Sequence, residues 1–131
     1  MADQEKTSIL VLDDEEIVIR RLRPALEKYG YEVETFVHSQ NAFDRIMAKN
    51  FDIVITDLKM EGMDGMQLLT VIKDRSPHTE VIVITGFATM ETAKTSFQKG
   101  VFDFLAKPFK LGEIFDTVRR AEEKIKSSQG A

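Results

Sequence analysis

Three short runs of apolar, mostly β-branched residues occupy consecutive positions in the chain, at residues 9–12, 53–55 and 81–84. A strand with one face in water alternates apolar and polar side chains, whereas a strand covered on both faces is apolar throughout. The three runs therefore predict strands of a parallel sheet that carries helices on both faces. This requirement favours an α/β fold.

Amphipathic segments lie between and after these runs. In residues 111–125, apolar side chains recur at helical spacing while Lys, Arg and Glu fill most of the other positions. Four further helices are expected, at residues 17–29, 41–49, 65–75 and 90–98. Two more strands are expected, at residues 32–36, where alternation indicates an edge strand, and at residues 104–106. A β-α unit repeated five times requires right-handed crossovers around one parallel sheet.

Local signals refine these boundaries. Gly30 and Gly100 stand where the C-terminal caps of two helices belong. Pro24 is expected to kink or shorten the first helix, because proline lacks the N–H that a helix interior needs. Residues 1–7 and roughly 127–131 are expected to be frayed ends. We expect residues 1–131 to form a single domain with a core at about 8–126.

Composition excludes several kinds of chemistry. The 131 residues contain no cysteine and only two histidines, His38 and His78. Disulfides, thiolate catalysis and cysteine- or histidine-rich metal sites are therefore excluded, and a cytoplasmic location is expected. The formal net charge of −4 argues against direct binding to nucleic acid. The polar N-terminal residues and the shortness of every apolar run predict neither a signal peptide nor a membrane span.

Polar residues follow four of the expected strands at the point where each strand ends. The carboxyl ends of parallel strands meet at one edge of a sheet, and ligands of open α/β sheets bind there. We therefore expect three carboxylates, one hydroxyl and one ammonium to converge at this edge. The residues are Asp13 and Asp14, Asp57, Thr85, and Lys107.

Such a group of side chains has a specific chemical use. Two carboxylates ~4 Å apart repel by about 4 kcal/mol at an effective dielectric constant near 20, so cations must balance them. Oxygen ligands with room for water suit Mg²⁺, and Lys107 supplies a second positive charge. A divalent cation, a lysine and a hydroxyl around one carboxylate can stabilise a phosphoryl group during transfer to it. Asp57 is the candidate nucleophile.

The chain resembles the receiver domain of two-component response regulators, of the kind found in chemotaxis regulators. The resemblance covers about residues 8–126. It implies a flavodoxin-like, doubly wound (βα)5 fold, in which a five-stranded parallel sheet has the order 2-1-3-4-5. The matching segments are Leu10-Val-Leu-Asp-Asp-Glu15, residues 52–60 with Gly62 and Asp64-Gly65 behind them, Val83-Ile-Thr-Gly86, and residues 100–109.

The resemblance also implies roles for single residues at the site. Asp57 would accept a phosphoryl group from a sensor histidine kinase or a phosphotransfer protein. Asp14 and Asp57 would bind Mg²⁺ directly, together with the backbone carbonyl of Lys59. Asp13 would act largely through water, and Lys107 would pair with the phosphoryl group.

A conformational switch is implied as the result of phosphorylation. Thr85 would donate its hydroxyl to the phosphoryl group, and Phe104 would turn inward as Thr85 moves. The face made by the fourth helix, last strand and fifth helix would then contact an effector or a second copy of the chain. The implied protein is a signalling switch that catalyses only its own phosphorylation and dephosphorylation. The Lys107–Pro108 bond is expected to be cis.

Three features depart from the commoner pattern of the family. Glu61 stands where proline is usual, which predicts a looser turn after Met60. Phe104 lacks the hydroxyl of the commoner tyrosine. Lys59 and Phe87, each two residues after a site residue, line the expected path of water to Asp57, so they are expected to influence dephosphorylation.

Three other functions are compatible with parts of the pattern. A phosphatase of the haloacid dehalogenase type also uses an aspartyl nucleophile and Mg²⁺, but it has a second Asp where this chain has Lys59. A flavodoxin-like or P-loop nucleotide binder would carry a glycine-rich phosphate loop, which this sequence lacks. A degenerate receiver that only scaffolds would not need the complete set of site residues.

Overall fold

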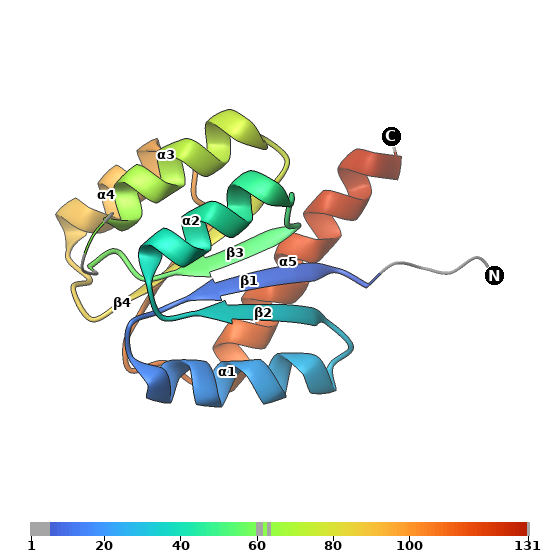
Figure 1. Cartoon of the computed structure of the whole chain (residues 1–131), viewed down its shortest axis with the longest axis horizontal. Helices are drawn as coiled ribbons and strands as arrows, with labels where there is room; N and C mark the ends of the chain where they lie inside the picture. The colour runs from blue at the N-terminus through green and yellow to red at the C-terminus, as the bar shows by residue number, and fades with distance from the viewer. Residues whose placement is uncertain (1–5, 60–61, 63, 131) are drawn as a thin grey trace.

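The computed structural model describes residues 6–59, 62 and 64–130, in which strands and helices alternate (Figure 1). The strands are β1 (Ser8–Leu12), β2 (Glu32–Phe36), β3 (Ile53–Thr56), β4 (Glu80–Thr85) and β5 (Asp103–Ala106). The helices are α1 (Glu16–Lys28), α2 (Ser39–Ala48), α3 (Gly65–Arg75), α4 (Met90–Gln98) and α5 (Leu111–Gly130).

All five strands are parallel, in the order β2-β1-β3-β4-β5, which confirms the expected topology. Every residue of β1, β3 and β4 is buried, as their consecutive apolar residues predicted. In the edge strand β2 only Val33 is buried. The register pairs Leu12 with Thr56, so the residues that follow, Asp13 and Asp57, leave the sheet side by side.

Helices cover both faces of the sheet, α1 and α5 on one face and α2, α3 and α4 on the other (Figure 1). Alternate residues of each central strand point into one of two hydrophobic clusters. Ile9, for example, packs with the α1 and α5 side chains, and Leu10 packs with those of α2 and α3. This double coverage is the physical reason for the uninterrupted apolar runs.

The bounds of the first helix agree with expectation to within one residue, and Pro24 does not shorten it. Arg20, whose carbonyl loses its usual partner to the proline, is exposed to water. One other boundary differs from expectation. The frayed end expected from about residue 127 was wrong, because α5 continues to Gly130.

Other local expectations are confirmed. Gly30 and Gly100 follow α1 and α4 with φ of 93° and 96°, a backbone conformation that favours glycine. The Lys107–Pro108 bond is cis. The looser turn expected at Met60 and Glu61 lies outside the described residues. No helix in the described part is long and apolar enough to cross a membrane.

Candidate functional site

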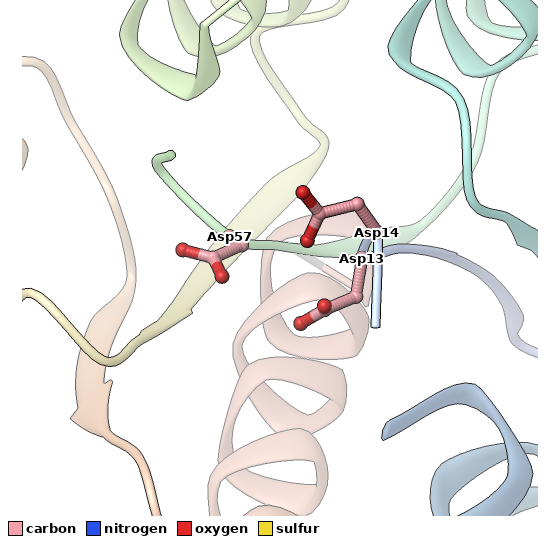
Figure 2. Close-up of side chains that lie close together, drawn as sticks. All are labelled: Asp13, Asp14 and Asp57. Atoms are coloured by element: carbon pink, nitrogen blue, oxygen red, sulfur yellow. The ribbon is translucent and has the colours of Figure 1, made fainter. Parts of the chain in front are cut away.

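Three aspartates gather where β1 and β3 end (Figure 2). One carboxylate oxygen from each of Asp13, Asp14 and Asp57 lies within 4.8 Å of the others. Asp13 and Asp57 are buried, whereas Asp14 is exposed. The strand register brings them together, because β1 and β3 are hydrogen-bonded neighbours that end at the same edge.

Lys107 reaches this group from the loop after β5. Its Nζ lies 2.9 Å from Asp57 Oδ2 and 2.8 Å from Asp13 Oδ2. A third carboxylate contact, which we did not foresee, joins Nζ to Glu15 Oε1 at 2.6 Å. The backbone N–H of Lys107 donates to the carbonyl of Thr85 at 2.8 Å, which fixes the loop against the end of β4.

Burial and charge act in opposite directions on this cluster. Burial alone would lower the pKa of Lys107, but its close contacts with the carboxylates of Asp13, Glu15 and Asp57 outweigh burial and raise the pKa above the ordinary lysine value. Burial raises the pKa of Asp13, and the contact with Lys107 only partly offsets this shift. The contacts with the carboxylates therefore favour the charged ammonium, and burial disfavours the charged form of Asp13.

The carboxyl group of Asp57 has two differently bonded oxygens. Oδ1 accepts hydrogen bonds from the backbone N–H groups of Leu58 at 2.6 Å and Lys59 at 3.3 Å. Oδ2 accepts from Lys107. Gly65, the first residue of α3, packs directly on this segment and donates its N–H to the carbonyl of Leu58 at 3.0 Å. The turn after β3 thus holds the Asp57 side chain in a fixed orientation.

Thr85 ends β4 at the same edge, with its side chain buried. Its hydroxyl oxygen accepts a hydrogen bond from the N–H of Phe87 at 3.0 Å, which leaves the hydroxyl proton available to another acceptor. Phe104 on β5 is partly buried against the hydrophobic cluster of α2 and α3. Thr85 therefore lies at the site, and Phe104 pairs in register with Val83, two residues before Thr85 on β4.

An open depression of about 480 Å³ leads to Asp57. Its rim includes Lys59 and Phe87, whose ammonium and ring centroid are 5.7 Å apart. Its floor includes Asp57 and Lys107, and Glu15 lines it from the start of α1. Sequence reasoning missed Glu15, although its position directly after Asp13 and Asp14 was an available signal.

The donor set suits a hard divalent cation. All three acidic side chains offer oxygen atoms, the ligands that Mg²⁺ prefers. Oδ2 of Asp13 is buried and, despite its short distance to Lys107, has no well-directed hydrogen bond to any group in the described part of the chain. Three carboxylates share the single Lys107 ammonium, so a divalent cation beside this oxygen would balance the remaining negative charge.

Comparison with known proteins shows the family of this chain. The model of the response regulator receiver domain family matches residues 9–119. The chain belongs to this family. The receiver domain is the phosphoacceptor part of a response regulator in two-component signalling, and it acts as a signalling switch.

Individual relatives agree with the assignment. The chain is 34% identical over 117 residues to the C4-dicarboxylate transport transcriptional regulatory protein DctD of Rhizobium meliloti, covering 89% of this chain and 25% of DctD. It is 34% identical over 113 residues to the transcriptional regulator NtrC of Escherichia coli, covering 86% of this chain and 24% of NtrC. The receiver therefore spans about a quarter of the length of these curated relatives.

Solved structures agree as well. A response regulator receiver domain protein from Clostridium thermocellum superimposes with a TM-score of 0.84 at 34% identity, covering 92% of this receiver and 97% of that chain. The beryllofluoride-activated receiver domain dimer of NtrC4 superimposes with a TM-score of 0.86 at 34% identity, covering 91% and 98%. Both confirm the flavodoxin-like fold.

Proposed function

We propose that Asp57 of this receiver accepts a phosphoryl group and that Lys107 and Thr85 stabilise it. The observation that carries the proposal is the contact of 2.9 Å between Lys107 Nζ and Asp57 Oδ2, next to two further carboxylates. Asp57 is the nucleophile because its carboxylate is held by the adjacent backbone and opens into the depression. The donor is a phosphohistidine on a sensor histidine kinase or a phosphotransfer protein.

The transfer needs only the donor, the Asp57 carboxylate and one proton from water. An oxygen of the Asp57 carboxylate forms a bond to phosphorus as the bond from phosphorus to the donor nitrogen breaks. The electron pair stays with the donor imidazole, which takes a proton from water. Lys107 counters charge on the phosphoryl oxygens, and the Thr85 hydroxyl donates to one of them. Later attack by water on the same phosphorus returns Asp57 to its free form.

Asp13, Asp14 and Asp57, with the backbone carbonyl of Lys59, are the groups that would hold Mg²⁺. When bound, Mg²⁺ supplies positive charge to the phosphoryl oxygens and offsets the repulsion among the aspartates. Asp13, being buried, orients the cluster through its contacts with Lys107 and with the backbone N–H of Glu15, which donates to Asp13 Oδ1 at 2.9 Å.

Phosphorylation also changes the surface that transmits the signal. The negative charge of the phosphoryl group attracts the Thr85 hydroxyl and the Lys107 ammonium, and this attraction shifts the loops and Phe104 toward an active conformation. The receiving surface is the α4-β5-α5 face, which carries the exposed Phe97, and it contacts an effector or a second copy of the chain. We also propose that residues 1–131 act as one receiver domain, in the cytoplasm.

Phosphorylation by acetyl phosphate tests the proposal directly. With Mg²⁺ present, we expect intact-mass measurement to show one added phosphoryl group on the wild type and none on Asp57→Asn, which lacks the nucleophile. Asp64→Asn is the matched control, because Asp64 is a nearby carboxylate that caps α3 and lies outside the cluster. A phosphorylated Asp57→Asn variant would exclude Asp57 as the acceptor.

Lys59 and Phe87 are expected to set how long the phosphoryl group survives. Their side chains contact each other across the rim, so they restrict the entry of water to Asp57. Phe87→Ala should shorten the lifetime of the acyl phosphate by about two- to tenfold, an effect of up to one power of ten in rate. Lys59→Ala should also change the lifetime of the acyl phosphate. The measurement is loss of phosphate after removal of the donor, with the distant Phe97→Ala as control. Unchanged lifetimes in both rim variants would contradict the prediction.

A further inference from the structure

The ammonium of Lys107 has three N–H groups to donate, and an exposed residue takes one of them. Nζ donates to Glu15 Oε1 at 2.6 Å and to Asp57 Oδ2 at 2.9 Å. Glu15 has a side chain that is 55% exposed, whereas that of Asp13 is fully buried. Nζ also lies 2.8 Å from Asp13 Oδ2.

The ammonium is therefore shared between two buried carboxylates and one exposed carboxylate. Glu15 holds it from the mouth of the site at 2.6 Å, a shorter distance than those to Asp13 and Asp57. The same mouth is the route by which a phosphoryl group reaches Asp57, because Glu15, Asp57 and Lys107 line one depression.

We propose that Glu15 is a positioning residue that competes with the entering phosphoryl group for Lys107 and so slows the phosphorylation of Asp57. The inference rests on the proposed function of Asp57. As phosphoryl oxygens take up the Lys107 ammonium, the flexible Glu15 side chain turns into water. Only this hydrogen bond is exchanged, and the transfer step itself is unchanged.

The chain offers a matched control in the next residue. Glu16 is also an exposed glutamate at the start of α1, but it lines a neighbouring depression beside His38. Glu15→Gln and Glu16→Gln remove the same charge within one residue of each other. The Glu15 side chain makes no capping hydrogen bond to α1, so its replacement leaves the start of that helix intact.

The first measurement is the rate of phosphorylation by acetyl phosphate with Mg²⁺, followed by intact mass. Glu15→Gln should be phosphorylated about three- to fivefold faster than the wild type, the change expected for removing one exposed ion pair. Glu16→Gln should match the wild type. Equal acceleration in both variants would show a general charge effect, and slower phosphorylation of Glu15→Gln would show that Glu15 assists the transfer; either result overturns the proposal.

The second measurement uses the protein without metal or donor. Nuclear magnetic resonance of the Lys107 ammonium should show at least about twofold faster proton exchange with water in Glu15→Gln, because a neutral amide oxygen accepts more weakly than a carboxylate. An unchanged exchange rate would contradict the proposal that Glu15 holds the Lys107 ammonium in solution. If the wild type itself takes no phosphate from acetyl phosphate, the proposed function fails and this inference fails with it. If only the acceleration by Glu15→Gln is absent, the proposed function stands.

Discussion

Gly65→Ala is expected to lower the free energy of unfolding by about 3 kcal/mol or more, the upper range for overpacking. A Cβ at this position would clash with the carbonyl oxygen of Asp57 and would lie 2.7 Å from Cα of Leu58. Both are backbone atoms, so no side chain can rotate away to make room. Gly65 does not have a positive φ, so the entire effect comes from this close approach.

Urea denaturation of the two proteins measures the effect. Gly112→Ala in α5 is the control, because, apart from adjacent residues and the nearby backbone of α5, no atom of the described residues lies within 4 Å of its added Cβ. Alanine favours a helix interior over glycine by up to about 1 kcal/mol, so the control should be unchanged or slightly more stable. Any folded Gly65→Ala protein should also be phosphorylated more slowly, since the backbone of Asp57 must move. A Gly65→Ala variant as stable as the control would contradict the contact.

Lys107→Met is expected to lower the free energy of unfolding by about 2–4 kcal/mol at neutral pH without Mg²⁺, because breaking a buried ion pair strands its partner charges. The lysine side chain is 13% exposed and the two aspartate side chains that it contacts are 0% and 6% exposed. Methionine, like lysine, has a long unbranched side chain, so the loss of unfolding free energy comes mainly from removal of the positive charge. Added Mg²⁺ should recover more stability in the variant than in the wild type, because a cation replaces the missing ammonium.

The pH dependence has a defined sign. The pKa of Lys107 is raised in the folded protein, so its stabilising contribution is complete below the ordinary value of 10.5 and is lost as pH rises beyond it. Wild type and variant should therefore converge in strong base. The pKa of Asp13 is also raised, and a raised carboxyl pKa means that stability is gained as pH falls through it. In Lys107→Met the pKa of Asp13 should rise further, because the neighbouring positive charge is gone. Mild acid should therefore also reduce the difference in stability between the wild type and the variant.

Urea denaturation at a series of pH values, with and without Mg²⁺, measures the difference in unfolding free energy between the wild type and Lys107→Met. Lys110→Met is the control, since Lys110 is an exposed residue of the same loop whose side chain lies outside the aspartate cluster. Equal losses in the two variants, or a loss for Lys107→Met that does not depend on pH, would contradict the electrostatic origin of the effect.

The parallel sheet, and the edge at which the site residues gather, were predictable because both depend on the pattern of apolar residues along the chain. Consecutive apolar residues in β1, β3 and β4 follow from coverage on both faces, and that coverage identifies the fold class. Parallel neighbours end at one edge, so Asp13 and Asp57 had to meet once β1 and β3 were adjacent. The strand order came from the resemblance to receiver domains and is confirmed.

Helix ends were harder to predict because they depend on packing. Pro24 argued for a kinked or shortened α1, yet the helix is not shortened, because Leu22 and Leu26 on either side of the proline are fully buried and their packing stabilises it. The polar composition after residue 126 argued for fraying, yet α5 continues to Gly130. Tertiary contacts and helix cooperativity outweigh local propensity in both places.

Side-chain contacts between distant segments could not be obtained from pattern at all. Glu15 and Lys107 are 92 positions apart, and their hydrogen bond depends on a loop conformation and on rotamers that no spacing encodes. The close approach of Gly65 to Asp57 is similar, since only folded coordinates show that a methyl group has no room there. Hydrophobic periodicity fixes which residues are buried, because burial is roughly additive along a strand or helix. Contacts between single atoms depend on how every element packs, and so they emerge only in the folded protein.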